Sequence, residues 1–347
     1  MARMFDPILD ADNEIDQVAR TYARFAAHEA AGVSPVYEDW ADGVAADEPV
    51  RALIAALPVA KRQPNLVFAA SRRAGAPVGP YRPWREWLLA HWESVRPIVM
   101  ARATQTNEAA RCATLLPVLS RIEGPVALLE VGASAGLCLH PDRYSYRYTG
   151  DAPAALDPDS GPSPVVLECA LSGTPAPSRL PDVVWRAGID RNPLDATDPD
   201  TRSWLETLVW PGQDDRRERI AAAARIAAAA PAPIRTGDLN EALADAAADA
   251  PADATLVVFH SAVLVYLSAA DRARFRGTVA DLDCTWISNE GAHVFPDIAS
   301  RLPADADAGG SFVLAVDGEP VALTGPHGHT YRGLSPEGRL PSDHSRS

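Results

Sequence analysis

The first third of the chain carries apolar residues at helical spacing. In IDQVARTYARFAAHEA, the residues Ile15, Val18, Tyr22 and Phe25 fall on one stripe of a helix. Further helices are expected over PVRALIAAL, over YRPWREWLLAHWESVRPIVMARA, which is interrupted or ends near Pro97, and over NEAARCATLLPVLSRI. The pattern predicts no strand before residue 125. We therefore expect residues 1–120 to form a helical region that covers a ligand and shapes its pocket.

From residue 125 onward, short apolar runs alternate with helical segments. The expected strands are VALLEV, DVVWRAGID, APIRTGDL, ATLVVFH, CTWISNEG, SFVLAVDG and PVALTGPHG. ASAGLCL, directly after the first of them, is expected to start a helix. This alternation predicts a Rossmann-like α/β fold with a mostly parallel, doubly wound sheet. A hairpin turning at Asp317-Gly318 is expected to add an antiparallel pair at one edge. The predicted domain covers 121–334, with a proline-rich insertion at 140–182 that carries a small hairpin, and 335–347 is expected to be a disordered tail.

Composition narrows the classes of partner. The chain has 46 acidic and 32 basic residues, a net charge of −14, which disfavours nucleic acid as a substrate. Its four cysteines are scattered, without metal-ligand spacing, and are expected to be buried thiols in a reducing cytoplasm, so we expect no metal site. No apolar run is long enough for a membrane helix, and the N-terminus lacks the layout of a secretion signal. We expect a cytoplasmic protein that acts on a small molecule or a peptide.

The stretch LLEVGASAGL has two interpretations. Gly132-Ala133-Ser134-Ala135-Gly136 matches G-x-S-x-G, the turn that presents a nucleophilic serine in α/β hydrolases. Asp297 or Asp317 could then serve as the acid and His327 as the base, in the correct chain order. However, a nucleophile elbow normally follows earlier strands that supply its oxyanion hole, and here the preceding strand is the first in the chain. The hydrolase hypothesis therefore remains the weaker one.

The alternative is a cofactor site, which accounts for more residues at once. Glu130 ends the first strand, and Gly132 and Gly136 allow a tight turn close to a ligand. Asp190 ends the next strand, where an acid can bind ribose hydroxyls. Asp238 and Leu239 end the third, where they can bind and pack on adenine. Ser134 stands where a further glycine is expected, which argues against a dinucleotide and for S-adenosylmethionine, whose cationic sulfonium favours acidic surroundings.

These motifs support two resemblances. The series LLEVGASAG, AGIDRNPLD, TGDL and VVFHSAVLVYL resembles the cofactor-side motifs of class I S-adenosylmethionine-dependent methyltransferases. Almost the whole chain, through ATQTNEAARC, EVGASAGL, PDRYSYRY, GIDRNPLD, LVWPGQ, FHSAVLVYL, WISNEG and PHG, also resembles an uncharacterised bacterial family, domain of unknown function 2332. The first resemblance implies O- or N-methylation of a small polar metabolite or peptide. A non-catalytic cofactor-binding protein of the same fold is the alternative.

Methyl transfer to oxygen or nitrogen requires alignment and removal of a proton. The candidates for this chemistry follow the later strands: His260, Glu290 and His327. Each also has a structural interpretation, as a hydrogen-bonded core histidine, a turn acid and a loop histidine. Four polar residues expected on a helix just before the first strand are candidates for substrate binding, although ordinary helix capping would also explain them: Gln105, Asn107, Glu108 and Arg111.

Overall fold

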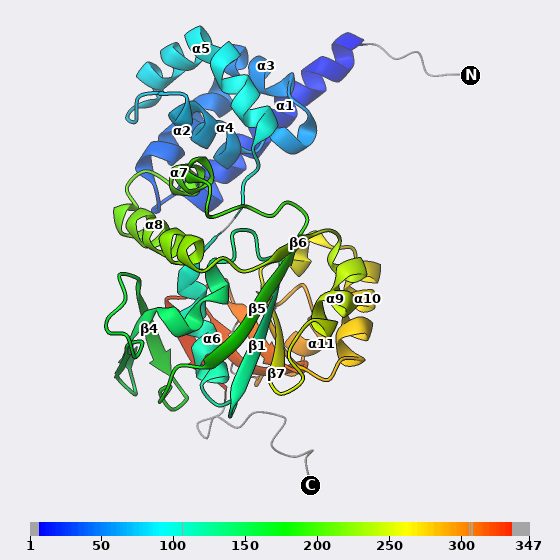
Figure 1. The fold of residues 1–347 in the computed structure, drawn as a ribbon. Coiled ribbons are helices and arrows are strands. Elements are labelled where there is room, and N and C mark those ends of the chain that lie inside the picture. The colour runs from blue at the N-terminus through cyan, green and yellow to red at the C-terminus, as the bar shows by residue number, and fades with distance from the viewer. Residues whose placement is uncertain (1–6, 106, 305, 307, 335–347) are drawn as a thin grey trace, which may run out of the picture. The chain divides into compact units, whose positions relative to one another are not determined.

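The protein is described by a computed structural model that covers residues 7–105, 107–304, 306 and 308–334. The chain divides into two compact units (Figure 1). A helical unit comprises Met1–Gln105 and Ser203–Glu218, and a sheet unit comprises Thr106–Arg202 and Arg219–Ser347. The expected helical region ended at residue 120, so this division assigns residues 106–120 to the sheet unit instead. The expected disordered tail, 335–347, lies outside the described residues.

The helical unit is built on a cluster of aromatic side chains. Trp40 and Trp84 stack with ring centroids 4.7 Å apart, and Phe68 packs edge-on against both. Trp204, far away in sequence, belongs to the same core. The indole of Trp84 donates a hydrogen bond to the buried Ser71 hydroxyl, so the polar edge of the ring is satisfied. The helices are α1 (Pro7–Phe25), α2 (Pro35–Ala46), α3 (Glu48–Ala55), α4 (Pro64–Arg73), α5 (Tyr81–Ala101) and α7 (Pro199–Leu208).

Helix α5 continues through Pro97, where the sequence predicted an interruption or an end. The helix is instead kinked at His91, whose backbone is non-helical. The Nδ1 atom of His91 lies 2.8 Å from the carbonyl oxygen of Trp87. The imidazole ring of His91 also stacks on the indole ring of Trp87.

The sheet unit contains an eleven-stranded sheet in the order β3-β2-β4-β11-β10-β9-β8-β7-β1-β5-β6. Helices cover both faces, with α9, α10 and α11 on one side of the central strands and α6 on the other (Figure 1). The helices are α6 (Cys112–Leu119), α8 (Asp214–Ala229), α9 (Leu239–Ala248), α10 (Ala269–Ala280) and α11 (Pro296–Ala299). The strands are β1 (Pro125–Val131), β2 (Ser145–Gly150), β3 (Ala154–Leu156), β4 (Val166–Ser172), β5 (Asp182–Asp190), β6 (Ile234–Thr236), β7 (Thr255–Ser261), β8 (Thr285–Gly291), β9 (Phe312–Val316), β10 (Glu319–Thr324) and β11 (Thr330–Gly333).

The central strands follow a doubly wound order. Starting from β1, the chain adds β5 and β6 on one side and then β7, β8 and β9 on the other. Strands β6-β5-β1-β7-β8 are mutually parallel, which confirms the predicted mostly parallel α/β sheet. The strand order reverses between β1 and β7. In open α/β sheets, ligands bind outside the carboxyl ends of the strands at this switch point.

The predicted edge position of the C-terminal hairpin is wrong. β9 and β10 do form an antiparallel hairpin that turns at Asp317 and Gly318, both with left-handed backbone. However, β11 continues the sheet beyond β10, and β4 of the insertion pairs with β11 in parallel. The insertion also contains the expected small hairpin, β2 with β3. The insertion strands extend the main sheet because β4 supplies free backbone groups to β11, which would otherwise be an edge.

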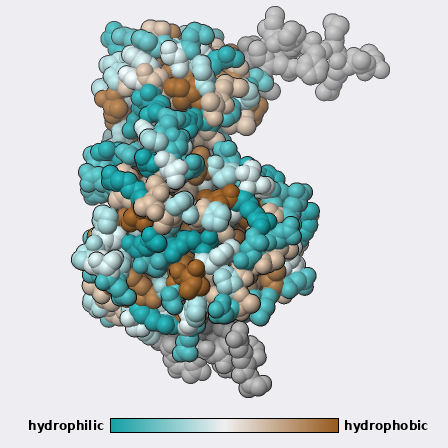
Figure 2. Space-filling view, in the orientation of Figure 1, coloured by the Kyte–Doolittle hydropathy of each residue, from teal (hydrophilic) through white to brown (hydrophobic). Residues whose placement is uncertain are grey.

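Side chains on β1 alternate between two environments. Ala127, Leu129 and Val131 join the hydrophobic core that includes Phe275 of α10. Because strand side chains point alternately to opposite faces, Glu130 lies on the other face of the sheet. On the surface seen in Figure 2, apolar residues form small separate groups among hydrophilic ones. Tyr266, in the loop that follows β7, is a large hydrophobic residue with an exposed fraction of 84%.

Candidate functional site

Backbone strain is concentrated at the switch point. Three described residues other than glycine have positive φ: Ser134 at 50°, Ala262 at 57° and Asp317 at 50°. Asp317 belongs to the hairpin turn, whereas Ser134 follows β1 and Ala262 follows β7, the two strands between which the order reverses. Such conformations cost about 1–3 kcal/mol each and gather where function requires them. This places the candidate site at the carboxyl ends of β1 and β7.

The glycine turn after β1 is bound to the end of β5. The backbone N–H of Gly132 donates to the carbonyl of Ile189 at 2.8 Å, and Ser134 N–H donates to Oδ2 of Asp190 at 2.8 Å. The other oxygen of Asp190 accepts from Asn192 N–H at 2.8 Å. Asp190, predicted to bind ribose, therefore holds the turn in this structure. Both of its oxygens retain a lone pair for a further donor.

The predicted helix after the turn is absent from the described residues. Residues 137–143 form two 3₁₀ turns instead, η4 (Leu137–Leu139) and η5 (Pro141–Arg143). Gly136 is left-handed, and Pro141 cannot donate the hydrogen bond that would continue a helix. Gly132 is required for packing, because a Cβ there would lie 2.4 Å from Cγ2 of Val263 in the loop after β7. The two loops of the switch point are thus in direct contact.

Asn107 acts as a clamp on the glycine turn. Its side-chain nitrogen donates to Ser134 Oγ at 2.8 Å, and its side-chain oxygen accepts from Ala135 N–H at 3.0 Å. Asn107 is buried but does not lie on a helix, contrary to the sequence prediction, because the helical segment begins only with η3 (Ala109–Arg111). Its amide therefore fixes the turn, a role that spacing along the sequence does not indicate.

Glu108 and Arg111 also bind the protein itself. Glu108 caps η3 by accepting from Ala110 N–H, and it forms an ion pair with Arg219 at 3.3 Å. Arg111 donates to the carbonyls of Ser261 at 2.9 Å and Pro326 at 3.1 Å, and so ties the end of β7 to the loop between β10 and β11. Gln105, the fourth predicted substrate residue, is half-buried at the end of the helical unit.

Glu130 is a buried carboxyl group with an unused oxygen. The residue is 8% exposed, and its Oε2 has no hydrogen-bond partner among the described residues. Burial raises the pKa of Glu130 well above its usual range, Cys138 and Asp190 raise it further, and Arg111 opposes them. Glu130 therefore keeps its proton to a higher pH than an exposed glutamate does. A positively charged group beside it would favour the ionised form.

Glu290 shows the opposite behaviour. Its Oε1 accepts three hydrogen bonds, from His260 Nδ1 at 2.8 Å, Val263 N–H at 2.9 Å and Leu264 N–H at 3.0 Å. Burial alone would raise the pKa of Glu290, but His260 and these backbone donors hold it below its usual value. Glu290 is therefore ionised. Its Oε2 is also buried without a partner in the described chain.

Both ring nitrogens of His260 are engaged. Nδ1 donates to Glu290, and Nε2 accepts from the indole N–H of Trp286 at 3.1 Å. The ring is fully buried and packs edge-on against Phe275. Because Leu256 and Val258 of the same strand belong to the core on the α10 side, His260 faces that side, opposite Glu130. Its contacts are those of a histidine that holds Glu290 in place.

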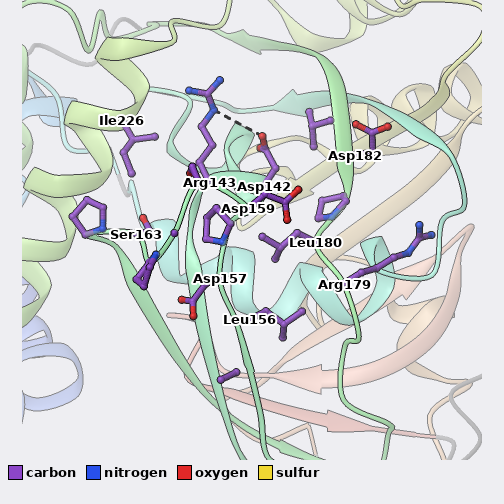
Figure 3. Close-up of a pocket in the computed structure, with 18 of the residues that line it drawn as sticks. Asp142, Arg143, Leu156, Asp157, Asp159, Ser163, Arg179, Leu180, Asp182 and Ile226 are labelled. Carbon is purple, nitrogen blue, oxygen red and sulfur yellow. Dashed lines mark ion pairs between the residues drawn. The ribbon is translucent and has the colours of Figure 1, made fainter.

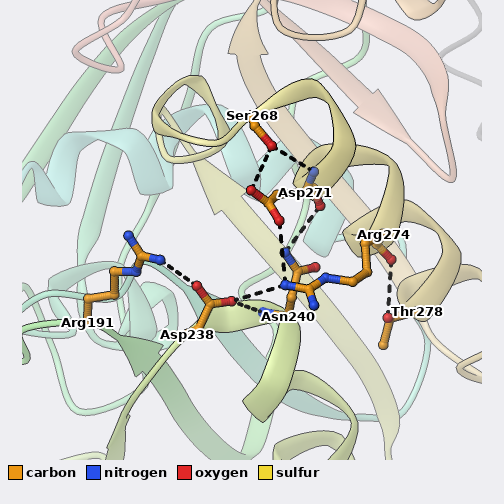
Figure 4. Close-up of polar contacts among 7 residues, drawn as sticks. All are labelled: Arg191, Asp238, Asn240, Ser268, Asp271, Arg274 and Thr278. Atoms are coloured by element: carbon orange, nitrogen blue, oxygen red, sulfur yellow. Dashed lines mark hydrogen bonds and ion pairs between the residues drawn. The ribbon is translucent and has the colours of Figure 1, made fainter.

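Asp238 lies at the end of β6 in a network of exposed charges (Figure 4). Its Oδ2 accepts from Arg191 at 2.5 Å, and its Oδ1 accepts from Asn240 N–H at 2.9 Å, which caps α9. Arg274 lies 3.9 Å from the same carboxylate. The hydrogen bond from Arg191 is the main cause that lowers the pKa of Asp238. Leu239, its predicted partner in adenine binding, is buried.

Ser134 has no general base in contact. Its hydroxyl is bonded to Asn107, and the residue is 5% exposed. His327, the base of the hydrolase hypothesis, is exposed in the turn between β10 and β11. Asp297 is paired with Arg276 at 2.8 Å, and Asp317 accepts from Trp286 N–H at 2.8 Å. The described structure brings no histidine to the serine.

Two cavities in the sheet unit are lined by residues other than the three acids at these strand ends. One, of about 1080 Å³, is open to solvent and is lined by the insertion, the start of β5 and the end of α8 (Figure 3). Several carboxyl groups and arginines line it, and Asp142 is held there by Arg186 at 3.0 Å. The other, of about 270 Å³, lies against Ala135 and Gly136 of the glycine turn. Neither cavity was predicted, because its walls come from segments far apart in the sequence.

Neither a metal-binding cluster nor a membrane-spanning helix is found among the described residues. Within them, no group of three or more His, Cys, Asp or Glu side chains is arranged to hold a metal ion. No helix in this part of the chain combines the length and the apolar character needed to span a membrane.

The fold and the site define an α/β protein with a doubly wound central sheet and a strained, acidic switch point. Residues 19–332 match the family model described as "Uncharacterized protein conserved in bacteria (DUF2332)". The chain belongs to this family, as its motifs suggested. No curated protein and no solved structure matches the chain.

Proposed function

We propose that this protein is an S-adenosylmethionine-dependent methyltransferase that acts at oxygen or nitrogen of a small polar metabolite or a peptide. The observation that carries the proposal is Glu130, a buried carboxyl group with an unpartnered oxygen, beside a glycine turn at the switch point of a doubly wound sheet. Ser134 and Ala262, both strained, flank the same place. The three acids at the ends of β1, β5 and β6 are Glu130, Asp190 and Asp238.

The residues present fit such a cofactor. Glu130 offers its free oxygen to a positive group, and a cation bound there stabilises the carboxylate. Binding is then accompanied by release of the proton that Glu130 holds in the free protein. Asp190 keeps an acceptor lone pair on each oxygen for hydroxyl groups while it holds the turn. When bound, S-adenosylmethionine supplies an electrophilic methyl group on its sulfonium.

The protein's own contribution is alignment and proton removal. Asn107, Asp190 and the Ile189 carbonyl fix the glycine turn, so that a bound ligand meets a preorganised surface. Among the three candidate bases, Glu290 is ionised and has a free oxygen, so we assign to it the removal of a proton from the acceptor. His260 orients Glu290 through its Nδ1 proton. His327 lies on an exposed turn and has no assigned step.

Calorimetric titration with S-adenosylhomocysteine and S-adenosylmethionine tests the proposal. We expect micromolar binding by the wild-type protein and a loss of at least tenfold in Glu130→Gln and Asp190→Ala. The control Glu168→Gln, on an exposed residue of β4, should bind as the wild type does. Heats measured in buffers of different ionisation enthalpy should reveal proton release with the wild type and none with Glu130→Gln.

Two other results would decide against the proposal. Absence of binding at millimolar ligand, together with fluorophosphonate labelling of Ser134, would establish the hydrolase alternative, which the left-handed backbone of Ser134 also fits. Binding without release of S-adenosylhomocysteine across a panel of amines, alcohols and carboxylates would indicate a cofactor-binding protein without catalysis.

A further inference from the structure

The 270 Å³ cavity beside the glycine turn is lined mostly by residues with apolar side chains, although polar atoms, including backbone groups, make up about as much of its surface as apolar atoms do. All lining residues except His140 and Asp195 are glycine, alanine, proline, leucine or isoleucine, and they come from the turn itself, the loop after β5, the end of α8 and the start of β6. None of Glu130, Asp190 and Asp238 lines it. The volume is that of about nine water molecules, at roughly 30 Å³ each, which suits a small organic molecule.

His140, a residue of this lining, has a ring nitrogen without a hydrogen-bond partner among the described residues. It is 1% exposed, and its Nδ1 lies 2.9 Å from Nη1 of Arg186. Arginine can only donate, so Nδ1 accepts and the neutral ring carries its proton on Nε2. Burial lowers the pKa of His140 to about 3, and the charges of Arg186 and Arg143 act in the same direction, so the ring stays neutral. Nε2 has no partner among the described residues.

The other polar residue of the lining limits the charge of an occupant. Asp195 is exposed, and its carboxylate accepts from the backbone N–H of Thr197 at 2.8 Å and from the Thr197 hydroxyl at 2.6 Å. The hydroxyl contact is the main cause that lowers the pKa of Asp195, which is therefore ionised. A carboxylate at this cavity repels anions, and the apolar walls do not compensate a buried charge.

We propose that this cavity is a binding site for a small uncharged molecule with an apolar body and one carbonyl or ether oxygen, which accepts the Nε2 proton of His140. The apolar body displaces water from the alanine, proline and leucine walls, and the oxygen satisfies a donor that the fold leaves buried and unpaired. The site does not depend on the proposed methyl transfer. It lies against Ala135 and Gly136 of the glycine turn, and its lining includes none of the three acids that the cofactor proposal uses.

A matched pair of probes tests this site in the wild-type protein. Acetophenone carries the carbonyl oxygen, and α-methylstyrene has the same shape with a CH₂ group in its place. We expect acetophenone to bind at least tenfold more tightly and to shift the Nε2 proton resonance of His140 in protein labelled with ¹⁵N-histidine. Equal affinity of the two probes, or no binding of either at its solubility limit, would overturn the proposal.

Variants locate the site and the donor. His140→Phe should bind both probes equally, because the donor is replaced by an apolar ring. Ala232→Phe, which fills the cavity, should abolish binding, whereas Ala229→Phe, on the exposed end of α8 at the other cavity, should leave it unchanged. Retained preference in His140→Phe, or retained binding in a folded Ala232→Phe, would show that the probes bind elsewhere.

Discussion

Two buried glutamates at the same edge of the sheet have pKa values shifted in opposite directions. Glu130 ends β1 with an unpaired oxygen and a raised pKa, whereas Glu290 ends β8 with three hydrogen bonds to one oxygen and a lowered pKa. They face opposite sides of the sheet. The difference shows that burial alone does not decide ionisation, because the number of donors aimed at the carboxylate can reverse its effect.

The largest expected effect is on stability at the Glu290 end. Glu290→Ala removes the acceptor of three buried donors and should lower the free energy of unfolding by about 3–5 kcal/mol. Urea unfolding measures this change. Glu290→Gln keeps a carbonyl oxygen in place and should lose less, and Glu168→Ala on an exposed strand position should change little. If Glu290→Ala and Glu168→Ala lowered the free energy of unfolding equally, Glu290 would not have the structural role that we assign to it.

Ionisation of Glu130 should lower the free energy of unfolding as the pH rises. Between its unfolded and its raised folded pKa, the folded protein binds a proton that the unfolded chain releases, so Glu130 makes stability fall as the pH rises. Glu130→Gln removes this pH-dependent loss of stability, because glutamine does not ionise. It should be more stable than the wild type by on the order of 1–3 kcal/mol at pH 9 and equal to it near pH 4. Urea unfolding across this range measures the difference, and a gap that narrows with rising pH would contradict it.

Glu290 should show the complementary acid dependence. Its folded pKa is lowered, so its stabilisation is present above the unfolded pKa and is lost as the pH falls through the folded value. The difference in unfolding free energy between the wild type and Glu290→Gln should therefore shrink below about pH 4. If instead it grew in acid, Glu290 would be protonated in the folded protein and the comparison with Glu130 would fail.

The clamp on the glycine turn should have a smaller effect on stability. Asn107→Ala removes the contacts with Ser134 Oγ and Ala135 N–H and should cost about 1–2 kcal/mol. Asn107→Asp keeps the acceptor for Ala135 and should lose part of this amount. Under the proposed function, both variants should also bind S-adenosylhomocysteine more weakly, which calorimetry measures. Unchanged affinity with reduced stability would limit Asn107 to a structural role.

The smallest effect is expected at the half-buried carboxylate of the third strand end, Asp238. Arg191 is 74% exposed in its side chain, so Arg191→Ala should change stability by less than about 0.5 kcal/mol despite its contact with Asp238. Thermal unfolding at low and high salt measures this. A loss above about 1 kcal/mol would mean that Asp238 resembles the buried glutamates more closely than its exposure indicates.

Local sequence patterns predicted which segments form strands and turns better than they predicted which strands pair with one another in the sheet. The short apolar runs predicted the central parallel strands, and the Asp317-Gly318 turn predicted a hairpin, because both depend on residues adjacent in sequence. The position of that hairpin was wrong, since strand pairing between β4 and β11 depends on backbone groups some 160 residues apart. The helix expected after the glycine turn was wrong because Gly136 and Pro141 favour 3₁₀ turns there.

The candidate site was predicted in part. The sequence indicated Glu130, Asp190 and Asp238 at successive strand ends, and the structure brings them to one edge of the sheet. It did not indicate that Asn107 and Arg111 bind the protein's own backbone, or that Ala262 and Val263 complete the switch point. Side-chain partners across such distances leave no periodic signal in the chain.

The sequence by itself determined the α/β class, the parallel core strands, the acidic glycine turn and the family. These follow from hydrophobic periodicity and short motifs, which act over a few residues. Only the tertiary structure decided which carboxyl groups are ionised, which donors remain unpaired and where cavities form. Those properties depend on burial and on hydrogen-bond partners from distant segments, so the pKa of the same residue type, glutamate, is raised at the end of β1 and lowered at the end of β8.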